Sequence, residues 1–423
     1  MDGATSAWFD REIAGCSFAD ERLNKRLRNL LERMGDAIGA SIPLACQDWA
    51  NTKAAYRFFS NDRFNEAEIL AGHFQSTQSR FAATEGPILV LQDTTEFSYQ
   101  RERPERIGLT YRVNSGKDKA GRFRMHTVCG LLMHRWLENM RQSTALFGEP
   151  ARCIHVGDRE SDIYELFCVA QELGTHFLVR SCVDRLAEDG DHTIADEMKD
   201  AEIAGQHHVE VCDSKGHVGT ATVEIRYRSI HVLPPIGKQK RYPALTLTVL
   251  HAQEREEPTD RARIDWKLIT DLPVHSYDAA IEKLRWYALR WKIEVFHKVL
   301  KSGCRAEEAR LRTAERLVKL LSVFCILSWR VFWMTMINRS VPNAEPGLAL
   351  TKVETRLLDQ LVPDTAYRPP RGKTLSHYLT KIARLGGYLA RASDPPPGNT
   401  VMWRGLSRLT DIKLGATLCA SYG

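Results

Sequence analysis

Four residues whose side chains suit phosphoryl chemistry lie close together in the second half of the chain. They are Tyr287, Arg290, Glu294 and Lys301. The stretch that carries them has no proline, and its first glycine is Gly303, so it predicts a helix that ends there. At about 100° per residue, the four side chains fall within roughly a sixth of a turn of one another. A carboxylate in such a row can bind a metal ion while the neighbouring cations hold phosphates.

The same helix has a second, apolar stripe that predicts packing on a core, formed by Trp286, Leu289, Ile293, Phe296 and Leu300. The polar stripe also has a simpler interpretation as a solvated face. Charge pairs three and four residues apart contribute roughly a few tenths of a kcal/mol each and need no ligand. Charge alone does not separate the two interpretations. A metal site would need further carboxylates from elsewhere in the chain, whereas a solvated face would not.

Two such carboxylates follow apolar runs that predict buried strands. Residues 87–99 predict a buried strand whose apolar run ends at Asp93, and Asp158 follows residues 153–157, just before a helix opens. If the two strands are neighbours, both carboxylates point at one place. Each residue taken alone would also suit a turn. Asp162 lies about one helical turn beyond Asp158 and is expected to cap or brace that helix.

The elements around these residues alternate between helix and strand. Residues 17–64 predict helices with a leucine stripe and many basic residues, the first helix ending at Pro43 and the second spanning residues 49–59. This basic helical head suits DNA binding, and a solvated helix pair suits the pattern equally well. Residues 108–119 predict a loop, 123–133 a strand and 135–147 a helix.

The second half of the chain changes texture. Residues 183–262 contain period-two segments separated by polar turns, which predict an inserted antiparallel sheet. An apolar strand resumes at residue 266, the central helix begins near residue 277, and the tail from about residue 341 is helical. The apolar run Leu320–Ile337 is interrupted by Arg330, so it predicts a buried helix and no membrane span.

Composition limits the classes of protein that fit. A chain of 423 residues with 43% hydrophobic and 26% charged residues predicts a soluble protein of two or three domains. The net charge of +6 mildly favours an acidic partner such as nucleic acid. Ten scattered cysteines without a Cys-x-x-Cys pair, and no signal peptide, predict reduced thiols and a cytoplasmic location.

The order Asp93, Asp158, Glu294 on strand, strand and helix resembles the DDE transposases, specifically insertion-sequence family four, the transposon-five type. That group carries Tyr-x2-Arg-x3-Glu-x6-Lys, which residues 287–301 match. It also carries Asp-Thr-Thr at the first acid and Asp-Arg-Glu-x-Asp at the second, matched by residues 93–95 and 158–162. Resemblance extends to Ala54-Ala-Tyr-Arg57-Phe and to the tail's Leu-Gly-Gly and Trp-Arg-Gly blocks, and so covers nearly the whole chain.

The resemblance implies an α/β fold with a ribonuclease-H-like catalytic core and an inserted antiparallel β subdomain. Helical domains would flank this core. The implied domains are residues 1–70 for DNA binding, 71–340 for catalysis with the insertion at about 183–262, and 341–423 for dimerisation. The implied activity is cut-and-paste DNA transposition, with strand cleavage followed by strand transfer.

The resemblance also implies roles for single residues. Asp93, Asp158 and Glu294 would hold two Mg²⁺ ions, for which Mn²⁺ can substitute. Contacts to DNA would come from Arg57, Arg180, Trp266, Tyr287, Arg290 and Lys301, with Trp266 stacking on a flipped base. The implied partners are transposon-end inverted-repeat DNA, target DNA and a second copy of the chain.

One interval departs from the family pattern. Between Asp93 and Asp158 a turn, a further strand and a loop are expected after residues 123–133, yet the helix at residue 135 follows almost at once. This spacing indicates an internal deletion in the sheet that supports Asp93. Two functions therefore stand: an active transposase, and an inactive remnant that binds DNA ends or pairs with intact copies. A ribonuclease-H-like nuclease unrelated to mobile DNA is a third.

Overall fold

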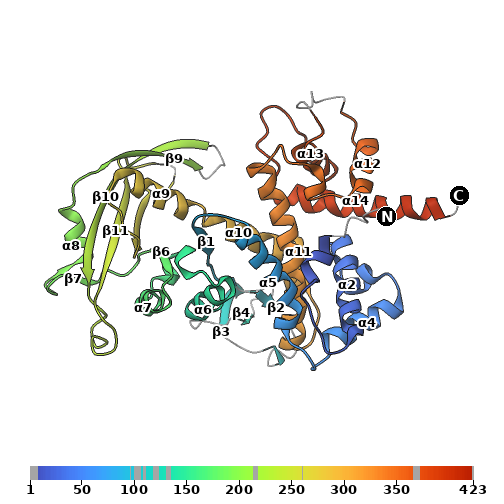
Figure 1. Cartoon of the computed structure of the whole chain (residues 1–423), viewed down its shortest axis with the longest axis horizontal. Helices are drawn as coiled ribbons and strands as arrows, with labels where there is room; N and C mark the ends of the chain where they lie inside the picture. Colours follow the sequence, from blue (N-terminus) through green and yellow to red (C-terminus); the bar gives the residue numbers. More distant parts are fainter. Residues whose placement is uncertain are drawn as a thin grey trace. The chain divides into compact units, whose positions relative to one another are not determined.

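The computed structural model describes residues 8–95, 97–99, 106–107, 111–117, 123–129, 135–212, 218–259, 261–364 and 372–421. Its contacts divide the chain into two compact units (Figure 1). Unit 1 comprises Met1–Arg80, Thr95–Gly130 and Val295–Gly423; unit 2 comprises Phe81–Thr94 and Leu131–Glu294. The first and last segments of the chain therefore share one unit.

A mixed sheet dominates unit 2 (Figure 1). Its order is β1 (Ile88–Leu91), β5 (Cys153–Gly157), β6 (His176–Arg180), β12 (Asp265–Thr270), β11 (Leu245–Glu254), β10 (Val218–Val232), β7 (Leu186–Ala187) and β8 (His192–Thr193). A further strand, β9 (Gly205–Cys212), pairs with β10. β1, β5 and β6 are parallel, whereas β12 is antiparallel to both β6 and β11. The predicted insertion is thus continuous with the parallel strands.

The two faces of this sheet bury different apolar clusters. Phe177 and Val179 of β6 pack with α6 (Arg135–Phe147) and α7 (Tyr164–Leu173), whereas Leu178 packs in the cluster of α9 (Tyr277–Ala288). Neighbouring residues of a strand point to opposite faces, so β6 is covered on both sides. A short helix, α8 (Ile194–Lys199), begins with a capping box formed by Thr193 and Asp196.

Unit 1 is mostly helical. Its helices are α1 (Trp8–Ile13), α2 (Glu21–Asp36), α3 (Ile42–Cys46), α4 (Trp49–Phe59), α11 (Ala314–Ser340), α12 (Lys352–Leu361), α13 (Leu375–Leu385) and α14 (Asn399–Ser421). A separate three-stranded sheet has the order β2 (Phe97–Tyr99), β4 (Phe123–Cys129), β3 (Tyr111–Lys117). Two helices, α5 (Glu66–Ala82) and α10 (Trp291–Lys298), cross the boundary between the units in sequence.

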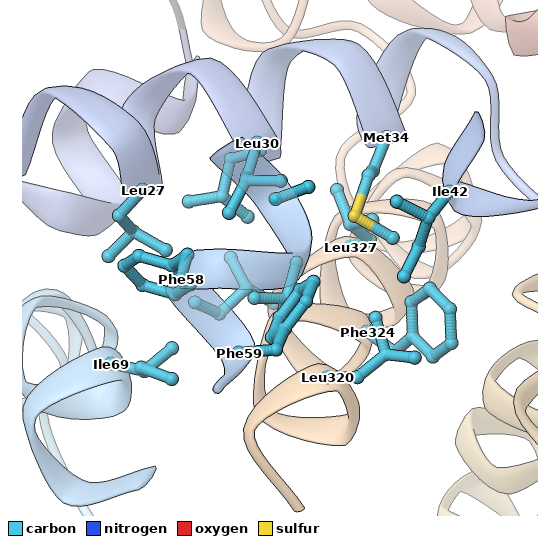
Figure 2. Packing of buried hydrophobic residues seen from close by; sticks show 14 of the residues in the cluster. Leu27, Leu30, Met34, Ile42, Phe58, Phe59, Ile69, Leu320, Phe324 and Leu327 are labelled. Atoms are coloured by element: carbon cyan, nitrogen blue, oxygen red, sulfur yellow. The ribbon is translucent and has the colours of Figure 1, made fainter. Parts of the chain in front are cut away.

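The N-terminal helices pack through the leucine stripe that the sequence predicts. Asp20 caps α2 by accepting a hydrogen bond from the Arg22 N–H, and Leu27 and Leu30 face inward. Figure 2 shows these leucines with Phe58 and residues of α11 in one buried cluster. This packing makes the start of the chain and α11 parts of one core.

α11 contains the apolar run predicted as a buried helix. By length and composition alone it could cross a membrane, but 67% of its most apolar window is buried inside the protein. Leu320 and Val323 lie in the core shared with α2, and Val331 and Met334 lie in a second core with α13. This burial supports the prediction of a core helix.

Most predicted elements are present. The helices at residues 49–59 and 135–147 have the predicted bounds, and the period-two segments form β9, β10 and β11. Three predictions are wrong, and the third, the single helix over residues 287–301, belongs to the candidate site below. Pro43 does not end the first helix, which stops at Asp36, but lies in the first turn of α3, where its missing N–H costs nothing.

The second wrong prediction is the loop at residues 108–119. Residues Tyr111–Lys117 form β3, whose backbone pairs with β4; the rest of that segment lies outside the described residues. The alternation of Tyr111 and Val113 with polar residues is a strand pattern that the nearby glycines obscured. The predicted strand 123–133 is observed as β4, and residues 130–133 lie outside the described range.

Candidate functional site

Two of the predicted carboxylates follow adjacent parallel strands of unit 2. In the register of β1 and β5, Leu91 lies opposite Val156, and the Gln92 N–H donates to the Val156 carbonyl at 2.9 Å. Asp93 is the next residue, and Asp158 directly follows β5. Because parallel neighbours end at the same edge of a sheet, both carboxylates lie at that edge.

Local hydrogen bonds fix the loops that carry these carboxylates. Asp93 accepts from the Thr94 N–H at 2.9 Å, and Asp158 accepts from the Glu160 N–H at 2.9 Å. The Thr94 hydroxyl donates to the Glu160 carboxylate at 2.7 Å, which ties the two loops together. Asp158 thereby caps a short 3-10 turn (Arg159–Ser161), and α7 begins only at Tyr164.

Arg290 joins the third predicted carboxylate to the first. One terminal nitrogen of its guanidinium lies 3.8 Å from the Asp93 carboxylate, and the other lies 2.6 Å from that of Glu294. The side chains of Asp93 and Arg290 are largely buried, at 14% and 19% exposure, whereas Glu294 is 55% exposed. The guanidinium is therefore a fixed positive charge held between two of the three carboxylates.

The pKa of Asp93 reports this environment. The pKa is raised from 3.8 to about 6, mostly by burial and then by the negative charge of Asp158, with a smaller contribution from Glu294. The positive charge of Arg290 acts in the opposite direction. Asp93 is thus within electrostatic reach of both of the other carboxylates.

The predicted single helix over residues 287–301 is wrong. α9 ends at Ala288, and Leu289 and Arg290 form a turn in which their N–H groups bond to the carbonyls of Trp286 and Tyr287. α10 then begins, and it ends in a π-helical turn (Val299–Gly303). The break coincides with the burial of Tyr287 and with the two ion pairs of Arg290, which can offset the helical hydrogen bonds lost there. The spacing of residues in the sequence does not reveal these tertiary contacts.

The break separates the four residues of the predicted polar stripe. Tyr287 is only 6% exposed, in the core below β12, and meets the Trp266 ring edge-on at 5.8 Å. Lys301 belongs to unit 1, where its ammonium lies 3.9 Å from the Glu307 carboxylate and 5.6 Å from the Phe97 ring. Only Arg290 and Glu294 remain paired as the spacing predicts.

The other predicted DNA contacts lie on well-formed elements. Arg180 ends β6 and donates to the Asp265 carbonyl at 3.1 Å, and half-buried Trp266 lies on β12 opposite Ala252. Arg57 is exposed on α4 in unit 1, and within the described part of the chain it has no ion pair. Arg180 and Trp266 therefore share a sheet with Asp93 and Asp158.

Asp162 braces a loop and caps no helix. Its carboxylate pairs with Arg185 at 2.6 Å and accepts from the N–H groups of Cys182 and Val183 at 2.6 and 2.9 Å. It holds the chain just after β6 against the turn that follows Asp158. Asp162 therefore acts as a brace, but it braces the segment after β6 and not the helix that follows Asp158.

A buried polar chain below the site was not predicted. The Gln92 amide lies 2.8 Å from Nδ1 of His155, and the Thr144 hydroxyl lies 3.3 Å from Nε2. Burial lowers the pKa of His155 to about 4, so the ring is neutral at physiological pH. The sequence signal was available, because Gln92 and His155 are polar residues inside otherwise apolar strands.

The residue types at this edge fit a hard divalent cation, which prefers carboxylate oxygens. Among the described residues, however, no three His, Cys, Asp or Glu side chains lie close enough together to form a ligand set. Asp93 and Asp158 follow neighbouring strands, and Glu294 bonds to Arg290.

Comparison with known protein families bears on the other end of the chain. Residues 5–64 match the family model described as transposase DNA-binding. This match supports a transposase that binds DNA. It spans α1 to α4, and so includes Arg57.

The matched segment presents an exposed face on α4. Gln47, in the left-handed region with φ of 64°, separates α3 from α4. Trp49 is 77% exposed and Tyr56 41% exposed, and Lys53 is exposed as well. Aromatic and basic side chains on one helix suit contact with nucleic acid.

Proposed function

We propose that this protein is a DDE transposase of insertion-sequence family four that cleaves transposon-end DNA and transfers the freed strand to a target. The observation that carries the proposal is the convergence of Asp93 and Asp158 at one sheet edge, with Glu294 joined to Asp93 through Arg290. The transposase DNA-binding match over residues 5–64 gives independent support for the DNA substrate. The parallel order β1-β5-β6 supports a ribonuclease-H-like core.

In this proposal Asp93, Asp158 and Glu294 hold two Mg²⁺ ions, with Mn²⁺ as a substitute. When bound, the ions would activate water or a 3′-hydroxyl and stabilise the leaving oxygen. Glu294 is the ligand that must turn toward the aspartates, and its 55% exposed side chain has room to do so. Arg290 would then be released to pair with a DNA phosphate.

The chain's own groups would position the DNA. Arg290 sits between the carboxylates and neutralises charge near the scissile phosphate. Trp266 would stack on a flipped base, since its ring lies on the strand next to β6 with Tyr287 against its edge. Arg180 would contact a phosphate near the cut, and Arg57 would contact the end sequence. Tyr287 and Lys301 stay phosphate contacts that the resemblance alone implies, because Tyr287 is buried and Lys301 belongs to unit 1.

Nicking of an oligonucleotide that carries the gene's flanking inverted repeat tests this function. We expect cutting at the repeat boundary with Mg²⁺ or Mn²⁺, and loss of cutting in Glu294→Ala. Arg285→Ala, an exposed change on α9, is the matched control and should cut normally. Metal-independent cutting, or cutting that persists in Glu294→Ala, would contradict the assignment.

A second function has one observation in its favour. Among the described residues β1 pairs only with β5, and all four residues of β1 are half-buried. β1, which leads to Asp93, is thus an edge strand of the described sheet. This position agrees with the loss of a neighbouring strand that the sequence indicated. An inactive remnant that binds DNA ends or pairs with intact copies would bind the oligonucleotide and leave it uncut in either metal.

The proposal also includes the assembly. Transposition requires two ends to be held together, so we place the active form as a homodimer on DNA, in the bacterial cytoplasm. Size measurements of the protein with and without inverted-repeat DNA would test this. A complex with one protein copy per DNA end and no pairing of ends would argue against it.

A further inference from the structure

Unit 1 contains a cavity of about 310 Å³ among residues of α1, α5 and α11. Three arginines line it: Arg11, Arg80 and Arg330. Glu12 is the one acidic residue in this lining, as far as the structure describes it. Three cations therefore face a single anion, and the cavity carries surplus positive charge.

Arg330 is the most unusual of these cations. It is only 8% exposed, in the middle of apolar α11, and its guanidinium donates to the Ala349 carbonyl. Within the described part of the chain no carboxylate lies at ion-pair distance from it. Burial lowers its pKa to about 10, so it remains charged at neutral pH. A buried cation without a paired anion costs considerable free energy.

Aromatic rings cover the faces of these guanidinium groups. Arg330 lies 5.4 Å from the ring centroids of both Trp8 and Trp333, and Arg80 lies 4.1 Å from that of Trp329. Stacking of this kind covers the face of a guanidinium group and not its edge, where the N–H groups that bond to oxygen acceptors lie. Because the ring faces are occupied, a planar apolar ligand is a poor fit.

The carboxylate of Glu12 is already shared. It pairs with Arg80 at 2.9 Å and with the His73 ring at 2.5 Å. Arg80 also donates to the Thr77 hydroxyl at 2.8 Å. Glu12 is therefore already engaged by Arg80 and His73. The negative charges of Glu354, on α12, and of Glu12 raise the pKa of Arg330 without forming an ion pair with it, whereas the positive charge of the exposed Arg11 lowers it.

We propose that this cavity binds an oxyanion of the phosphate class, held by the edge N–H groups of Arg330 and Arg11, with the charge of Arg80 beside it. Guanidinium forks match phosphate oxygens, and the cavity has room for a phosphate with an attached group or water. The oxyanion would link α1, which lies in the matched DNA-binding segment, to α11. The site does not depend on the catalytic assignment in unit 2.

The full-length protein tests this site with inorganic phosphate as the probe. Thermal unfolding is followed in phosphate and in chloride at equal ionic strength. If ~10 mM phosphate is well above the dissociation constant, the wild type should gain about 3 °C in phosphate. Arg330→Met should abolish the gain, and Arg11→Gln, an exposed change that leaves the fold intact, should reduce it. Arg63→Gln, exposed in the same unit and outside the cavity, is the matched control.

A second arm distinguishes a DNA phosphate from a free one. Phosphate at constant ionic strength is titrated into a complex of the protein with duplex DNA. Weakened DNA binding in the wild type, absent in Arg11→Gln, assigns the site to a backbone phosphate, whereas unchanged DNA binding assigns it to a free ligand. The proposal is overturned if chloride gives the same thermal gain, or if the gain survives in Arg11→Gln and in any folded Arg330→Met.

Discussion

The side-chain amide of Gln92 and the imidazole of His155 lie 2.8 Å apart between the parallel strands that lead to Asp93 and Asp158. Both residues are buried, and Thr144 approaches the other ring nitrogen. Such a contact fixes the relative position of two strands more narrowly than apolar packing does. It links the stability of the sheet to the placement of the two carboxylates.

His155 should make the protein sensitive to mild acid. Its pKa is about 4 in the folded protein and 6.5 for an ordinary histidine, so the unfolded chain binds a proton first as pH falls. Stability from this group is complete above pH 6.5 and is lost as pH falls towards 4. Between pH 7 and 5 the wild type should lose about 1–2 kcal/mol more than His155→Gln, measured by urea unfolding. Equal losses in both proteins would count against a neutral buried ring.

Asp93 should act in the opposite direction. Its folded pKa of about 6 lies above the ordinary 3.8, so stability from its protonated form is complete below pH 3.8 and is lost as pH rises through 6. Asp93→Asn removes this effect and should stabilise the protein at pH 7 by ~1 kcal/mol, after allowance for solvent screening. The variant should also abolish nicking. Reduced thermal stability at pH 7, with Thr95→Ala as the neighbouring control, would contradict the electrostatic account.

Arg290 should matter for both stability and cleavage. Arg290→Met leaves Asp93 and Glu294 without their shared cation, and the raised pKa of Asp93 should rise further. We expect nicking to fall ~100-fold, as when a charge-stabilising group is removed from other active sites. Rates are compared at saturating Mg²⁺ with Arg285→Met, an exposed α9 arginine. A change confined to DNA affinity would show that Arg290 only anchors the backbone.

Trp266 should affect one step of the reaction more than another. Trp266→Ala removes the ring that would stack on a flipped base, but leaves the carboxylates in place. Hairpin formation or resolution should fall more than first nicking, measured on the same labelled oligonucleotide. Trp266→Phe keeps an aromatic surface and should recover part of the loss. Equal impairment of both steps would indicate a general disturbance of β12.

The sequence predicted the order of elements well because their signals are local. Period two in residues 220–228 and the leucine stripe of α2 need no distant partner to be recognised. The break at Arg290 escaped prediction because it depends on the burial of Tyr287 and on an ion pair to Asp93, almost two hundred residues away. The Gln92–His155 contact likewise depends on strand register.

The candidate site was predicted as a set of residues but not as a geometry. Asp93 and Asp158 lie at one edge because their apolar strands pair in parallel, whereas the sequence predicted their meeting only on the condition that the two strands are neighbours. The position of Glu294 was inferred from an unbroken helix, and the observed turn and π-helical segment change the direction of its neighbours. Periodicity assigns a face to a residue only while the helix continues.

The pairing of β12 with β6 on one side and β11 on the other has a consequence for how such a chain can change over evolution. Because β11 is hydrogen-bonded to β12, and β12 to β6, the inserted strands are part of the central sheet. They cannot be lost or exchanged as an independent subdomain. Shortening residues 183–262 would have to spare β11, or the strand that carries Trp266 would become a free edge prone to pairing with other chains. Insertions and deletions should therefore concentrate in the connection between β9 and β10.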